Sequence, residues 1–143
     1  MRLIRARIDS AALRSNLAVI RSRAPHSRVM AMVKANAYGH GLVPTALALP
    51  DADAFAVARI EEAQALRNAG ISQRIVLLEG IQTADQLTMA AELQLDLVVH
   101  EFGQVELLEW RPATEFLADQ LIKLVGGQIA AREFQRLLPD VGR

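Results

Sequence analysis

VMAMVKANAYGHG, residues 29–41, sets out the first structural unit of this chain. Its first five residues are apolar, as in a buried strand, and Lys34 ends the apolar run. Gly39 and Gly41 then mark a polar turn, and the helical pattern of residues 42–49 follows and stops at Pro50. A buried strand, a turn and a helix in this order predict one βα unit of a parallel sheet.

The same alternation continues as far as residue 110. Short apolar runs predict strands at residues 54–58, 75–78 and 95–99, and helical patterns follow them at residues 60–69, 83–93 and 101–110. Gly70 is a natural helix end, and Thr83 is a suitable N-cap. Four such units predict an α/β fold built around parallel strands.

Segments outside this repeat differ in pattern. Arg5 to Ile8 is predicted to form an isolated strand, and Asp9 and Ser10 to cap a helix over residues 11–23. Beyond Trp110, helices are expected at residues 113–125 and 129–138. The pattern therefore divides the chain into a βα region, residues 1–110, and a helical tail, residues 111–143.

The number of units leaves two architectures open. Four to five parallel βα units resemble half of a TIM-type (β/α)8 barrel, here with an added helical tail, and a full barrel takes roughly 250 residues. A small doubly wound sheet of four or five parallel strands would also fit this length. The sequence alone does not separate the two.

Composition narrows the functional classes. The chain is 52% hydrophobic, has no cysteine, and balances 16 basic with 16 acidic side chains. This gives no summed positive field for nucleic acid or an acidic membrane, and excludes disulfides and cysteine nucleophiles. Charges interrupt the apolar residues of the first nine positions, and no later run approaches a membrane span. We therefore expect a cytoplasmic protein without nucleic-acid or membrane partners.

Lys34 is the leading candidate for chemistry, because only Lys34 and Lys123 are lysines. Ligands of parallel α/β sheets lie at the carboxyl ends of the strands, so Lys34 is expected at the mouth of a site above apolar walls. Desolvation favours the neutral amine, which attacks aldehydes. Tyr38 can offer its hydroxyl to a phosphate, and Gly39 and Gly41 let backbone amides approach such a phosphate. The alternatives are a lysine extending to solvent and a tyrosine ring packed on the sheet edge.

Other polar residues follow the later strands. Glu79, His100 and Glu101 lie where barrel enzymes keep site residues. Loop polarity and helix capping explain Glu79 and Glu101 better, whereas His100 fits either interpretation. The three histidines, at positions 26, 40 and 100, show no short metal-binding spacing, and no metalloprotease or phosphate-loop motif occurs. No metal site is expected.

VKANAYGHG also resembles the cofactor-attachment motif of the alanine racemases, pyridoxal 5′-phosphate enzymes of fold type III. Residues 6–25, 49–71, 74–80 and 95–109 resemble the corresponding stretches in family order. The resemblance implies interconversion of L- and D-alanine, with Lys34 as the catalytic residue that holds the cofactor as an aldimine and exchanges a proton with the substrate α-carbon. It also implies that Tyr38 contacts the cofactor phosphate.

The resemblance stops near residue 110. Family members take a second catalytic base, a tyrosine, from a C-terminal β domain across a dimer interface, whereas Tyr38 is the single tyrosine here. The later barrel strands and most phosphate ligands are not found, and the tail resembles nothing in the family. We therefore expect a truncated member with at most weak cofactor capture. Apolar residues on the open side of a partial barrel predict a homo-oligomer.

Three other functions are weighed against this one. A non-catalytic pyridoxal-phosphate-binding protein, like the single-domain cofactor-homeostasis proteins, is favoured by length but opposed by the NAYGHG continuation, residues 36–41. The second alternative is an inert fragment, whose sequence records descent from the family but which has no present activity. The third alternative is a decarboxylase or broad-specificity racemase of the same fold type, which the residues of the lysine motif disfavour.

Overall fold

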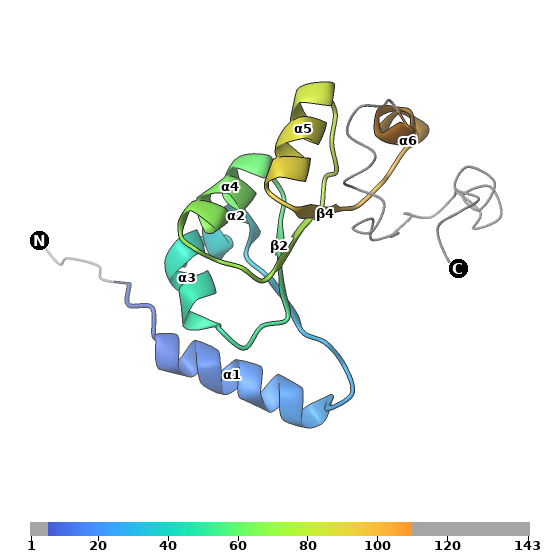
Figure 1. Ribbon diagram of the computed structural model, residues 1–143. Helices are drawn as coiled ribbons and strands as arrows, with labels where there is room; N and C mark the ends of the chain where they lie inside the picture. The colour runs from blue at the N-terminus through green and yellow to red at the C-terminus, as the bar shows by residue number, and fades with distance from the viewer. Residues whose placement is uncertain (1–5, 110–143) are drawn as a thin grey trace, which may run out of the picture. The chain divides into compact units, whose positions relative to one another are not determined.

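The computed structural model describes residues 6–109 of the 143-residue chain (Figure 1). Four strands form one sheet: β1 (Met30–Met32), β2 (Ala54–Val57), β3 (Arg74–Leu77) and β4 (Leu95–Leu97). The helices of the four units are α3 (Leu42–Ala48), α4 (Ile60–Asn68), α5 (Ala84–Glu92) and α6 (Phe102–Glu109). The predicted βα alternation is confirmed, and each element ends within a few residues of its expected boundary.

Strand order decides between the two architectures. The order in the sheet is β1-β2-β3-β4, the order of the sequence, and β1 and β2 pair in parallel with Met30 opposite Ala54. A doubly wound sheet places β1 in its interior, at the point where the order reverses, whereas a (β/α)8 barrel adds each strand to the one before it. The fold is therefore that of the first four units of a barrel.

Two compact units divide the chain, residues 1–75 and 76–143. In the first unit α1 (Ser10–Arg23) packs against α3, and α4 packs against both α3 and β2. Its core includes Phe55 and Leu66, which are fully buried. In the second unit α5 packs against β4 and α6, and the buried side chains include Leu87 and Leu95.

The N-terminal segment confirms one prediction and contradicts another. The Asp9 carboxylate accepts hydrogen bonds from the N–H groups of Ala11 (2.9 Å) and Ala12 (3.2 Å), so Asp9 caps α1 as expected and Ser10 is the first helical residue. The strand predicted at residues 5–8 is wrong over its described part, because residues 6–8 are not in a strand. An alternating pattern forms a strand only beside a partner, and β1 pairs with β2 alone among residues 6–109.

Asp53 fastens the start of the first βα unit. Its carboxylate accepts a 2.7 Å hydrogen bond from the Val29 N–H. It also forms a 3.0 Å ion pair with Arg21, near the end of α1. The Val29 bond, opposed by desolvation and aided by Arg21 and Arg28, holds the pKa of Asp53 below its ordinary value. The ionised carboxylate therefore connects α1 to the beginnings of β1 and β2.

Several sequence predictions fall outside the described residues. These are the helices at residues 113–125 and 129–138, together with Lys123. The division of the chain at residue 110 stays a prediction for the same reason. Among residues 6–109, no helix combines the length and the apolar character that a membrane crossing needs.

Candidate active site around Lys34

Lys34 lies at the carboxyl end of β1, as the sequence predicts. The preceding residue, Val33, is buried, and its N–H donates to the carbonyl of Ala56 at 2.9 Å, which extends the pairing with β2 one residue past the strand. Lys34 itself is half-buried. It makes no ion pair within the described part of the chain, so no carboxylate there holds its amine as a paired ammonium.

The turn after Lys34 has a conformation that the sequence analysis did not foresee. Residues 35–38 (Ala, Asn, Ala, Tyr) have φ angles of 53°, 56°, 52° and 54°, and the turn is part of α2 (Lys34–Tyr38). Four consecutive residues other than glycine are therefore in the left-handed α region. Such a conformation costs an L-residue roughly 1–2 kcal/mol, so the surrounding contacts must hold it in place.

Asn36 supplies much of that support. Its carbonyl accepts the N–H groups of Gly39 (3.1 Å) and Gly41 (3.0 Å), and its side-chain oxygen accepts the N–H of Leu42 (2.8 Å) at the start of α3. The two glycines were expected to let backbone amides approach a phosphate, and their own amides donate to carbonyls inside the turn.

A substitution at Ala35 tests the left-handed turn. Ala35→Gly is expected to stabilise the protein by about 1 kcal/mol, because glycine adopts positive φ without the steric penalty of a Cβ. Ala18→Gly, at an exposed position inside the ordinary helix α1, is the matched control and is expected to destabilise by about 1 kcal/mol. Urea unfolding followed by circular dichroism measures both. Equal destabilisation by the two substitutions would contradict the left-handed assignment.

Tyr38 is the last residue of α2, and His40 follows it after Gly39. Tyr38 is 62% exposed, so its ring is not packed on the sheet edge and its hydroxyl is accessible to a ligand. The Nδ1 atom of His40 lies 2.9 Å from the carbonyl oxygen of Ala37 and fastens the end of the turn. Lys34 and Tyr38 are thus carried by the same short element of the first unit.

The remaining strand-end residues belong to the second unit. The Nε2 atom of His100 lies 2.5 Å from the carbonyl oxygen of Leu78, so His100 contacts the segment after β3. Glu79 takes part through its backbone carbonyl, which accepts a 3.0 Å hydrogen bond from the Gln104 amide. Within residues 6–109, no group of three histidine, aspartate or glutamate side chains is placed to hold a metal ion.

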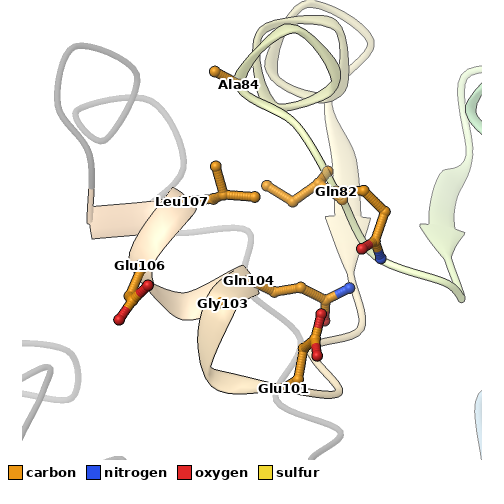
Figure 2. A pocket seen from close by; sticks show the side chains of 8 residues that line it. Gln82, Ala84, Glu101, Gly103, Gln104, Glu106 and Leu107 are labelled. Atoms are coloured by element: carbon orange, nitrogen blue, oxygen red, sulfur yellow. The ribbon is translucent and has the colours of Figure 1, made fainter.

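A surface hollow of about 500 Å³ lies next to Gln104 (Figure 2). Glu101 and Gln82 are among its lining residues, and Leu107 points toward the segment that carries Gln82. Gln104 is buried, and its Oε1 accepts the N–H of His100 at 2.7 Å. This arrangement shows that polar residues near the second unit's strand ends fix backbone positions.

Sequence reasoning missed the structural role of two residues, Glu62 beside the Lys34 turn in the first unit and Gln104 in the second unit. Glu62 accepts hydrogen bonds from the N–H groups of Asn36 (3.3 Å), Ala58 (3.0 Å) and Arg59 (3.2 Å). Both are the third residue of a helix that follows a strand. A glutamate or glutamine at this position is a known capping signal, and it could have identified them.

Known proteins match most of this chain. The family model "Alanine racemase, N-terminal domain" matches residues 8–116. The alanine racemase of Nitrosococcus oceani is 56% identical over 109 residues, which are 76% of this chain and 31% of that protein. The alanine racemase of Aeromonas hydrophila is 54% identical over 104 residues, or 73% of this chain and 29% of that protein. The chain thus spans about a third of the length of these relatives.

Solved structures agree with the sequence comparison. The alanine racemase from Acinetobacter baumannii superposes with a TM-score of 0.75 and 36% identity, over 81% of this chain and 34% of that one. The biosynthetic alanine racemase from Pseudomonas aeruginosa gives 0.68 and 45%, over 71% of this chain and 29% of that one. Because the family model covers most of the chain and the folds agree, the chain belongs to the alanine racemase family through its N-terminal domain.

Proposed function

We propose that this chain carries the lysine that binds pyridoxal phosphate in an alanine racemase, and that this residue is Lys34. One observation carries the proposal: Lys34 is half-buried at the carboxyl end of β1 and has no ion-pair partner among residues 6–109. An unpaired amine at this edge of a barrel sheet is placed where barrel enzymes bind their substrates. Membership of the family supports the assignment.

The residues present fit the two ends of this cofactor. Lys34 provides a primary amine that condenses with an aldehyde, and the exposed Tyr38 provides a hydroxyl that can donate to a phosphate. Pyridoxal phosphate, when bound, stabilises the negative charge that develops at Cα as alanine loses its α-proton. The Lys34 amine is then the group that removes or returns this proton on one face of the substrate, already in position.

Racemisation also needs a proton donor or acceptor on the opposite face. Tyr38, the single tyrosine, is assigned to the phosphate and does not serve this second role. We therefore propose that a residue other than Lys34 and Tyr38 supplies this second group. The 143 residues are expected to bind cofactor, and turnover of alanine depends on that second group.

Reductive trapping tests the assignment. The 143-residue chain is incubated with pyridoxal phosphate, reduced with borohydride, digested and analysed by mass spectrometry. The chain has three kinds of primary amine: its N-terminus, Lys34 and Lys123. We expect the adduct on Lys34, and we expect the Lys123→Arg variant to trap as much as the unmodified chain. Equal labelling of all three amines, or no labelling, overturns the proposal.

Measuring D-alanine formed from L-alanine separates the functions that share this cofactor. An adduct on Lys34 without D-alanine supports cofactor binding by the isolated chain. An adduct with turnover shows that a residue among these 143 supplies the second proton-transfer group.

Self-association is the second part of the proposal, and it rests on the edge strand β1. Met30 and Met32 are 41% and 40% exposed although they lie in a strand of the sheet. Among residues 6–109, β1 pairs with β2 alone, so its other edge offers unpaired backbone groups to another strand. We therefore propose that two copies of the chain associate through β1.

Light scattering tests this association. The unmodified chain is expected to scatter as a dimer or larger species, and Met32→Lys to weaken association at least tenfold, because it places like charges in the contact. Leu47→Lys, at another exposed apolar position in the first unit, is the matched control and should leave the association unchanged. A monodisperse monomer of the unmodified chain contradicts the proposal.

A further inference from the structure

Three helices of the βα units begin with the same side-chain arrangement. The side chain of the third residue of each helix accepts the N–H of the residue four positions earlier, one position before the N–H that a capping box uses. The bonds run to Glu62 from Ala58 (3.0 Å), to Gln86 from Gln82 (2.7 Å) and to Gln104 from His100 (2.7 Å). Glutamine serves this purpose twice, and glutamate once, in the helix next to the Lys34 turn.

The second hydrogen bond made by the Gln104 and Glu62 side chains explains why one position has glutamine and the other glutamate. The amide nitrogen of Gln104 donates to the carbonyl of Glu79, which follows β3, the strand of the preceding βα unit. Glu62 uses its second oxygen to accept the N–H of Asn36, which also follows the preceding strand. A carboxylate only accepts hydrogen bonds, whereas an amide offers one donor group and one acceptor. The left-handed turn presents an N–H at this point, so an acceptor is required.

We propose that Glu62 is a positioning residue for Lys34. Its carboxylate joins Asn36, two residues after Lys34, to Ala58 and Arg59 at the start of α4. A turn of four strained residues returns to another conformation unless its neighbours hold it, and such a change would redirect the preceding side chain. Glu62 therefore fixes the direction in which the Lys34 amine leaves the sheet. The inference rests on the proposed function, because it gives Glu62 the task of aiming the amine used there.

Glu62→Gln is the decisive variant. Both oxygens of Glu62 accept backbone N–H groups. In either orientation of the glutamine amide, its NH₂ group therefore faces an N–H donor, and the hydrogen bond on that side is lost. The side toward α4 has two donors, Ala58 and Arg59, and the side toward the turn has only Asn36, so we expect the turn to lose its acceptor. Glu61→Gln is the matched control, because Glu61 is an exposed neighbour in the same helical turn and the charge change is identical.

Two measurements report on the turn without racemase activity. The first is hydrogen exchange of the cofactor-free chain, where the amides of Ala37, Gly39 and Gly41 are expected to exchange about tenfold faster in Glu62→Gln than in Glu61→Gln. The second is the yield of borohydride-trapped pyridoxal phosphate on Lys34 divided by that on Lys123 in the same molecules. We expect this ratio to fall about tenfold in Glu62→Gln alone, with the melting temperatures of the two variants within a few degrees.

The outcomes separate this inference from the proposed function. Equal exchange and equal labelling ratios in the two glutamine variants overturn the positioning role of Glu62. If Glu62→Gln does not fold, Glu62→Asp replaces it, because the shorter carboxylate can still cap α4 but does not reach Asn36. If the unmodified chain forms no adduct on Lys34, the proposed function fails, and hydrogen exchange alone then decides whether Glu62 holds the turn.

Discussion

Lys34→Arg is expected to lower the borohydride-trapped cofactor at position 34 by at least about 100-fold, to background. Arginine keeps the positive charge and much of the length of lysine, but its guanidinium stays protonated and does not condense with an aldehyde. The fall is measured by mass spectrometry of digested, reduced protein. Lys123→Arg, which makes the same chemical change at the other lysine, is the control and should retain full labelling at Lys34.

Loss of folding does not explain the expected fall. Lys34 is half-buried and has no ion pair in the described part of the chain, so its replacement removes no buried partner. The free energy of unfolding of Lys34→Arg should therefore stay within about 0.5 kcal/mol of the unmodified value. Cofactor attachment to Lys34→Arg at any other amine, in the amount that Lys34 takes in the unmodified chain, would contradict the assignment.

Gly80→Ala is expected to destabilise the second unit by about 3 kcal/mol. A Cβ at position 80 would lie 2.5 Å from the carbonyl oxygen of Val98 and 2.7 Å from Nε2 of Gln104, and φ is +67°. The backbone oxygen of Val98 cannot move without disturbing the residues after β4. Urea unfolding by circular dichroism, with hydrogen exchange of residues 76–109, measures the loss and places it.

Gly70→Ala separates the two causes of this effect. Gly70 also has a positive φ, +80°, but a Cβ there would meet no atom within 4 Å. Its substitution should therefore cost only the backbone strain, about 1 kcal/mol. If Gly70→Ala and Gly80→Ala destabilise equally, the close approach of Val98 and Gln104 to Gly80 has no energetic importance.

Local sequence signals were sufficient where the deciding interaction is local. Asp9 and Thr83 cap their helices as predicted, because a side-chain oxygen there reaches N–H groups two or three residues away. The apolar run before Lys34 predicted the strand β1, but its predicted burial is wrong, because Met30 and Met32 are 41% and 40% exposed. The strand predicted at residues 5–8 failed in its described part because pairing depends on a partner far along the chain.

The order of strands and helices, the placement of Lys34 at a strand end and the family resemblance were all available from the sequence, since each depends on residue type and spacing over short distances. The left-handed turn was not, because alanine and tyrosine disfavour that backbone conformation when considered alone. It is maintained by two hydrogen bonds: the Leu42 N–H donates to the Asn36 side chain, and the Asn36 N–H donates to Glu62, 26 positions further on. Only the folded chain brings these groups together, so tertiary structure decided the geometry around Lys34.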